Sequence, residues 1–169
     1  MRTLTMRGYL ALFLLLGVVI AGVSFAGSAF AQSVALPVRH ATGEFVVSMT
    51  PDDPEAAEAG LGLASYRLSK VFTGGMVGSA RGQMLTGGPE GSQDTGTYVA
   101  IERFVGSLDG QEGAFLLAHR GDMTPDGYTL TISVVPNSGT GALEGIEGEF
   151  GLTVGPDGAH HYDLAYRLP

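Results

Sequence analysis

Cysteine and tryptophan are absent from the 169-residue chain, and basic residues are few: nine Lys and Arg stand against 17 Asp and Glu. Without cysteine the chain can form no disulfide and can carry no lipid on an N-terminal thiol, so the fold must rest on its core and its backbone hydrogen bonds. The acidic excess repels phosphate backbones and therefore argues against nucleic acid as a partner.

The N-terminal segment has the composition of an export signal. Arg2 and Arg7 precede an apolar stretch from Leu10 to about Val23, and small residues lead to Ala29-Phe30-Ala31. This pattern predicts a secretory signal over residues 1–31, a flexible N-terminus over residues 32–40 and a single domain over residues 41–169. The alternative is an uncleaved membrane anchor, since the charge-free stretch exceeds the roughly 18 residues that span a bilayer.

Cleavage after position 31 leaves 138 residues with 7 basic and 17 acidic side chains, a formal charge of −10. We expect an exported protein, periplasmic or extracellular, that has no contact with a membrane once the signal is removed. A chain of this length suits one domain with a sizeable core.

Glycine is abundant, at 27 residues spread along the chain, and each glycine costs a helix about 1 kcal/mol relative to alanine. Apolar and polar residues alternate between clusters of turn-forming residues, which indicates β-strands. The predicted strands run approximately over residues 43–49, 61–72, 76–85, 97–108, 114–122, 127–135, 142–150 and 160–168. The acidic connection over residues 51–60 is the one longer link, with room for a single helical turn at 55–59.

Short turns between consecutive strands predict an antiparallel meander of eight strands. Such a sheet can stay open, stack as a sandwich or close into a barrel, and closure removes aggregation-prone edges. We therefore predict an all-β fold, a closed or nearly closed eight-stranded antiparallel barrel. A barrel of this size encloses either a packed core or one small ligand.

Three blocks of the chain resemble a known bacterial family, domain of unknown function 3224. Its patterns Y-V-G-x-E-R-x-x-G-x-L-x-G, G-S-F-x-L-x-H-x-G and V-P-G-S-G-T-G-x-L-x-G are similar to 98–110, 113–121 and 134–145, with departures at Ala100, Ala114 and Asn137. The resemblance spans roughly residues 41–168 and implies an eight-stranded barrel like that of the plant allene oxide cyclases. It implies no established activity, because similarity of fold does not transfer chemistry.

The alternation of side chains along two strands identifies two ionisable residues as a candidate site. Glu102 shares a strand face with Tyr98 and Phe104, and His119 shares a face of the next strand with Phe115 and Leu117. An even-numbered loop at 109–112 places both sets on one side: a two-residue turn sets the acid diagonal to the imidazole, and a four-residue loop sets them directly opposite.

If that face lines the barrel, Glu102 and His119 could act as general acid and base, hold a polar group of a ligand, or form a purely structural buried pair. If they act as general acid and base, Glu102 and His119 are the catalytic residues. Candidate ligand contacts are Tyr98, Phe104, Phe115, Leu117, Ser138, Thr140 and Tyr162.

The remaining motifs do not indicate a catalytic or metal-binding site. The segment 136–141 lacks the lysine of a P-loop and the frame of a nucleophile elbow, so its hydroxyls at Ser138 and Thr140 either cap backbone groups or grip a ligand at the barrel mouth. His160 and His161 are adjacent and face opposite sides of a strand, so they cannot chelate one ion together. We expect no metal and no cofactor.

Three functions fit the sequence. The leading one is a binding protein whose interior holds a small apolar or amphipathic ligand. The second is a cofactor-independent isomerase or cyclase that uses Glu102 and His119. The third is a non-catalytic interaction protein or homo-oligomer with a filled barrel.

Overall fold

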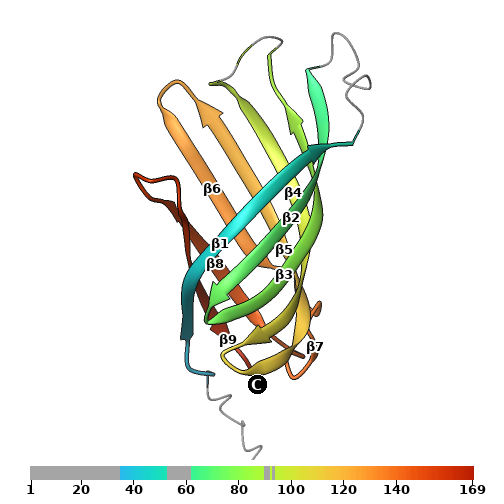
Figure 1. Ribbon diagram of the computed structural model, residues 1–169, viewed down its shortest axis with the longest axis vertical. Coiled ribbons are helices and arrows are strands. Elements are labelled where there is room, and N and C mark those ends of the chain that lie inside the picture. Colours follow the sequence, from blue (N-terminus) through green and yellow to red (C-terminus); the bar gives the residue numbers. More distant parts are fainter. Residues whose placement is uncertain (1–34, 53–61, 90–91, 93) are drawn as a thin grey trace, which may run out of the picture. The chain divides into compact units, whose positions relative to one another are not determined.

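The computed structural model describes residues 35–52, 62–89, 92 and 94–169. The predicted signal sequence and the predicted helical turn at 55–59 lie outside the described residues. All regular structure in the described part is β (Figure 1). The strands are β1 (Arg39–Pro51), β2 (Leu63–Gly74), β3 (Met76–Gly87), β4 (Gly96–Leu108), β5 (Gln111–Thr124), β6 (Gly127–Val134), β7 (Thr140–Gly141), β8 (Glu147–Val154) and β9 (His160–Arg167). None of the described residues forms a helix long and apolar enough to cross a membrane.

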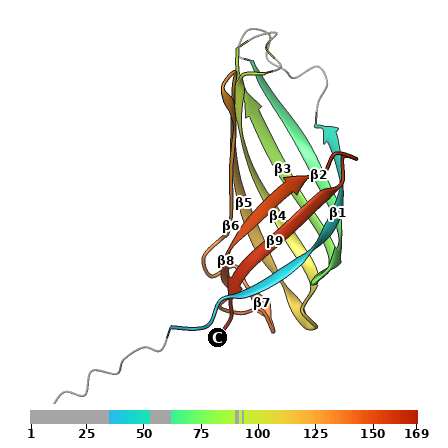
Figure 2. The same cartoon turned by 90° about the vertical axis from the view of Figure 1, so that its left-hand side faces the viewer.

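Eight of the strands close into a ring. Each of β1 to β5 pairs antiparallel with the next strand, β6 pairs with β8, β8 with β9, and β9 pairs back with β1. Figure 2 shows β9 lying beside β1 where the ring closes. The prediction of a closed eight-stranded antiparallel barrel is confirmed. β7 is a short ninth strand that pairs with β5 at Gly113 and Ala114.

Two strands begin four or more residues from the predicted position, and one of them, β8, also ends four residues later than predicted, at Val154. The strand expected over 142–150 begins at Glu147, because Gly141 and Gly145 have positive φ angles of 66° and 78° and residues between them form successive turns. β1 begins at Arg39 rather than near residue 43, since its first residues already pair with β9.

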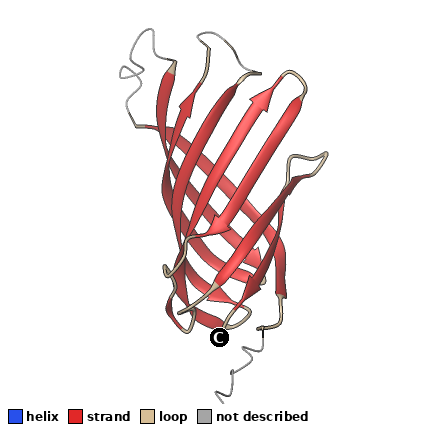
Figure 3. Cartoon of the chain, turned by 180° about the vertical axis from the view of Figure 1, so that it is seen from behind, coloured by secondary structure: helices blue, strands red, loops and turns tan. Residues whose placement is uncertain are grey.

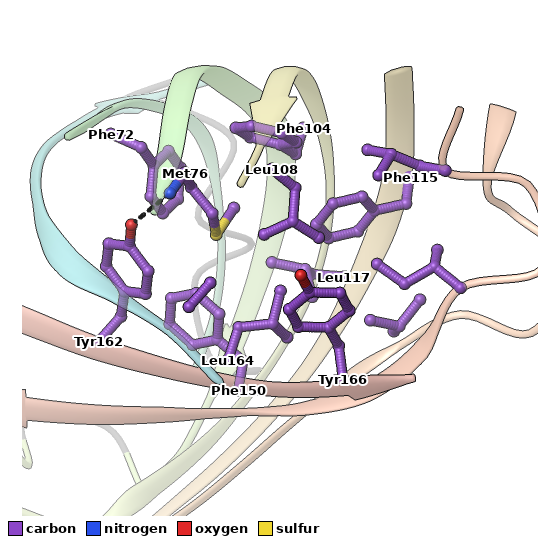
Figure 4. Packing of buried hydrophobic residues seen from close by; sticks show 14 of the residues in the cluster. Phe72, Met76, Phe104, Leu108, Phe115, Leu117, Phe150, Tyr162, Leu164 and Tyr166 are labelled. Atoms are coloured by element: carbon purple, nitrogen blue, oxygen red, sulfur yellow. Dashed lines mark hydrogen bonds between the residues drawn. The ribbon is translucent and has the colours of Figure 1, made fainter. Parts of the chain in front are cut away.

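The two ends of the barrel differ, and we name them by their connections. The lower half carries the β2–β3 turn, the β4–β5 turn and β7, and the upper half carries the β3–β4 connection and the β5–β6 turn (Figure 3). In the lower half the inward-facing side chains are fully buried and in mutual contact (Figure 4). The largest of them are Tyr166, Phe72, Phe104, Phe115, Met76, Leu108, Leu117, Leu143, Ile146 and Leu164.

Two tyrosines of β9 close the lower end. The Tyr162 hydroxyl accepts a hydrogen bond from the Met76 backbone N–H at 2.7 Å and donates one to the Thr73 carbonyl at 3.0 Å (Figure 4). The Tyr166 hydroxyl donates to the Asp109 carboxylate at 2.8 Å. These three bonds tie β9 to the β2–β3 turn, which lies just beyond β1, and to the β4–β5 turn on the opposite side of the ring. The lower half is therefore sealed by polar contacts around an apolar core.

The upper half is less complete. Inward-facing Met84, Tyr98 and Leu130 are only partly buried there. Only one residue pair, Ser133 with Glu149, joins β6 to β8, and the β8–β9 hairpin ends below the β5–β6 hairpin in Figure 1. Solvent therefore reaches inward-facing side chains in the upper half, whereas the inward-facing side chains of the lower half are buried.

Candidate functional site

A cluster of three ionisable side chains lies inside the barrel, contributed by three strands. Glu102 of β4 faces inward together with Lys70 of β2 and His119 of β5. One carboxylate oxygen, Glu102 Oε1, lies 2.8 Å from Lys70 Nζ and 3.0 Å from His119 Nε2. The side chain of Glu102 is fully buried, and those of Lys70 and His119 are 7 % and 5 % exposed.

The intervening strand β3 makes the Lys70–Glu102 contact possible. Lys70 pairs with Ala80 and Glu102 pairs with Gly82, so the inner face of β3 carries two very small residues between the lysine and the acid. A Cβ atom at Gly82 would lie 2.2 Å from the Ile101 carbonyl oxygen and 2.6 Å from the Glu102 Cβ. Glycine at position 82 thus leaves the space through which the lysine crosses one strand to reach its partner.

Glu102 is held as a carboxylate. Burial acts to raise its pKa, but the hydrogen bond from His119 and the charge of Lys70 oppose that effect, and the pKa of Glu102 falls below its ordinary value. A carboxylate can only accept hydrogen bonds, so the His119 Nε2 atom carries the proton in their contact. Lys70 is also placed 4.7 Å from the centre of the Phe45 ring, which adds a cation–π contact.

The second carboxylate oxygen is different. Among the described residues, no donor contacts Glu102 Oε2, although that atom is buried. A buried charged acceptor without a donor is rare and costly, and such atoms in folded proteins usually serve a bound water, ion or ligand. Oε2 is therefore the acceptor of this cluster whose hydrogen-bonding capacity no described residue uses, although the atom is buried.

The sequence placed two of the three residues correctly. A two-residue turn at Asp109 and Gly110, with φ angles of 47° and 83°, sets Phe104 opposite Phe115, as the shorter of the two predicted loops requires. Glu102 then lies diagonal to His119, and both face the interior. Lys70 was missed, although it lies between Leu68 and Phe72 at the inward parity of its strand.

The predicted ligand contacts fall into three groups. Phe104, Phe115, Leu117 and Tyr162 belong to the packed core of the lower half. Tyr98 lies in the upper half, where its ring covers Gly121 and its hydroxyl contacts that of Tyr128 at 2.9 Å. Burial and this hydrogen bond raise the pKa of Tyr98.

Ser138 and Thr140 bind backbone groups of β5. The Ser138 hydroxyl accepts from the Leu116 N–H at 3.0 Å and donates to the Val135 carbonyl at 2.7 Å, and the Thr140 hydroxyl donates to the Ala114 carbonyl at 3.4 Å. These contacts satisfy the edge of β5 where β6 has left the sheet. Both side chains lie at the lower end, away from the Lys70–Glu102–His119 cluster.

Metal-binding residues do not gather in the part of the chain that the structure describes. No three His, Cys, Asp or Glu side chains lie there in an arrangement that could hold an ion. His40 and His161 instead contact Asp163 and Glu44 on the outer surface.

Fold and cluster together define an eight-stranded antiparallel barrel with a packed lower half and a buried charged cluster above it. Residues 41–166 match the family described as "Protein of unknown function (DUF3224)", and the chain belongs to this family. A crystal structure of a DUF3224 protein of unknown function from Shewanella oneidensis MR-1 is similar, with 34% sequence identity and a TM-score of 0.71. The similarity covers 79% of this chain and 98% of that one. No curated protein matches the chain.

Proposed function

We propose that the protein binds a small amphipathic molecule in the upper half of the barrel, with the polar group of the ligand on Glu102. The observation that carries the proposal is the buried Glu102 Oε2, an acceptor that no described residue contacts. Partly buried Met84, Tyr98 and Leu130 supply an apolar wall above it. Few polar groups within a mostly apolar surface are typical of small-molecule sites.

The charges of the cluster restrict the polar group of the ligand. The Lys70 ammonium and the Glu102 carboxylate cancel, and an additional charge at this depth would have no counter-charge. A neutral donor, such as a hydroxyl group, satisfies Oε2 at no such cost. The ligand that fits best is therefore apolar with one neutral hydrogen-bond donor.

Catalysis by Glu102 and His119 has weaker support. A general base is most effective when its pKa lies near the working pH, whereas contacts with His119 and Lys70 lower the pKa of Glu102. The same contacts make the carboxylate a stable hydrogen-bond acceptor. We therefore favour binding over the isomerase or cyclase alternative.

Native mass spectrometry of the full chain tests the proposal. The wild-type protein should carry a co-purified small molecule, or take up 1-decanol when it is added, and the Lys70→Met/Glu102→Gln double variant should do neither. The double substitution removes both charges together, so that no unpaired charge is buried and the fold survives. Tyr128→Phe is the matched control, because it removes an exposed hydroxyl of the same half and should leave uptake unchanged. Equal uptake by wild type and the double variant would contradict the assignment of Glu102.

A further inference from the structure

The outer face of β1 to β4 carries an unusual group of arginines. Arg81 and Arg103 are exposed and lie directly opposite one another in the register of β3 and β4. Arg67 lies diagonal to Arg81, because it pairs with Gln83. These three account for three of the seven basic residues that follow the predicted signal, in a strongly acidic chain.

Like charges directly opposite in a sheet destabilise it. Neither Arg81 nor Arg103 makes an ion pair or a side-chain hydrogen bond with any other described residue. No described residue therefore offsets the electrostatic repulsion between the two guanidinium groups. An anion bound between them would remove that repulsion.

The neighbouring contact of Arg67 shows how this surface takes a carboxylate. Asp52 receives the Arg67 Nε–H at 2.9 Å on one oxygen, and Ser65 at 2.8 Å and Gln83 at 3.1 Å on the other. These contacts hold the pKa of Asp52 below its ordinary value. Arginine with short polar side chains on adjacent strands thus already forms one oxyanion site on this face.

Two adjacent hollows give the surface its shape. The arginine hollow, about 350 Å³, is lined by Ser48, Thr50, Arg67, Leu68, Ser69, Arg81 and Gly82. The apolar hollow, about 570 Å³, is lined by Ser65, Gln83, Met84, Leu85, Val99, Ala100, Ile101, Ala118 and His119. They meet where Arg67 pairs with Gln83. Both volumes lie in the range of small-molecule sites, which is about 300–1,000 Å³.

The outward-facing side chains of the apolar hollow are exposed to solvent, whereas Met84, Ala100 and His119 line it from inward-facing positions of the same strands. Leu85, Val99 and Ile101 are 47 %, 47 % and 50 % exposed and adjoin one another across β3 and β4. The distance along β4 from Arg103 to Val99 is about 13 Å at roughly 3.3 Å per residue. A charged end and an apolar remainder within this total length match an extended alkyl chain with an anionic head group.

We propose that the outer face of β1 to β5 binds a small amphipathic oxyanion, with its charged group on Arg81 and Arg103 and its apolar part over Ile101, Val99 and Leu85. This site lies on the opposite face of β4 from Glu102, and it accepts an anionic ligand where the interior cluster accepts a neutral one. A membrane surface fits less well, because the net charge of −10 after signal removal repels anionic lipid. Guanidinium groups bind carboxylate and phosphate alike, so both head groups belong to the proposal.

Isothermal titration calorimetry of the full chain with decanoate, decyl phosphate, 1-decanol and decyltrimethylammonium tests the site. Decanoate or decyl phosphate should bind, and the one that binds more tightly identifies the preferred head group. The cationic decyltrimethylammonium should not bind. The Arg81→Gln/Arg103→Gln variant should lose about tenfold or more in affinity for the anion, since two charge-assisted contacts are removed. Arg167→Gln, an exposed arginine of β9, is the matched control and should bind as wild type does.

Several results would overturn the proposal. Equal affinity of the Arg81→Gln/Arg103→Gln variant and wild type would exclude the two arginines. Tighter binding to phosphatidylglycerol vesicles than to either monomeric anion would assign the face to membranes. The thermal midpoint of the variant should not fall, because a repulsive pair is removed, so weaker binding cannot be attributed to unfolding.

The two sites of this barrel can be tested separately. The Lys70→Met/Glu102→Gln variant should retain anion binding, and the Arg81→Gln/Arg103→Gln variant should retain 1-decanol uptake. If the Glu102 variant alone loses the anion, that ligand lies in the interior and the outer-face site is wrong. If the arginine variant alone loses the anion while neither variant changes 1-decanol uptake, the interior proposal fails and the outer-face site stands.

Discussion

The lower and upper halves of this barrel are built from the same strands but are stabilised differently. Below, the interior is filled by aromatic and aliphatic side chains, and Tyr162 and Tyr166 satisfy the turns that close the end. Above, the interior holds Lys70, Glu102 and His119 under a wall that is only partly buried. One continuous sheet can therefore provide stability at one end and a candidate site at the other.

The largest expected effect is on the packed half. Phe104→Ala should lower the free energy of unfolding by about 3–5 kcal/mol, because it opens a cavity among fully buried rings of Phe72 and Phe115. Guanidinium chloride unfolding measures the loss. Ile101→Ala on the outer face of the same strand is the control and should change stability by less than about 1 kcal/mol. Comparable losses at the two positions would show that the lower core is not tightly packed.

A charge left without its partner should cost nearly as much in the upper half. Glu102→Gln is expected to lower the free energy of unfolding by about 3 kcal/mol, since the Lys70 cation stays buried without a carboxylate. Adding Lys70→Met should recover most of that loss, because the remaining groups are then neutral. Chemical unfolding of the single and double variants measures both values. Failure of the second substitution to restore stability would mean that the two residues are not coupled.

Acid should affect the two halves unequally. The pKa of Glu102 in the fold lies below its ordinary value of 4.5, so the stabilisation it provides is complete above about pH 4.5 and is lost as the pH falls through the folded-state pKa. Wild type should therefore lose stability between pH 5 and pH 3 faster than Lys70→Met/Glu102→Gln. Asp52 and Asp122, whose pKa values are also lowered, are present in both proteins, so their contribution to the pH dependence of stability cancels in the comparison. Parallel stability curves would contradict the lowered pKa.

The smallest effect should come from the hydroxyl that seals the lower end. Tyr162→Phe leaves the Met76 N–H and the Thr73 carbonyl without their partner and should cost about 1–3 kcal/mol. Tyr128→Phe removes a hydroxyl that is exposed and bonded only to Tyr98, and it should cost less than about 0.5 kcal/mol. Thermal unfolding distinguishes the two. An equal loss of stability in the two variants would show that the Tyr162 hydroxyl does not stabilise the lower end more than the Tyr128 hydroxyl stabilises the upper end.

Much of the fold could be predicted because it depends on local signals. Alternation gave each strand two faces, and turn residues such as Asp109 and Gly110 gave the hairpins, so the antiparallel order followed without tertiary information. The boundary error near residue 142 arose because Leu143 and Ile146 are apolar and buried in a loop that packs under the barrel. Their apolarity reflects burial, which alternation alone cannot separate from a strand.

The candidate site could be predicted only in part. Glu102 and His119 lie on adjacent strands joined by a tight turn, so parity alone brought them to one face. Lys70 reaches Glu102 across β3, and that contact depends on the side-chain sizes at Ala80 and Gly82 in three-dimensional register. The arginine pair on the outer face likewise depends on the register between β3 and β4.

The class of fold, the eight main strands and the common face of Glu102 and His119 could be derived from local sequence patterns, because backbone alternation and turn geometry act between neighbours in the chain. Three features required the folded barrel: which part of the interior is filled, the lysine that completes the buried cluster, and the carboxylate oxygen that faces no described donor. Those features depend on how distant strands are aligned around a closed ring, and no local rule fixes that alignment.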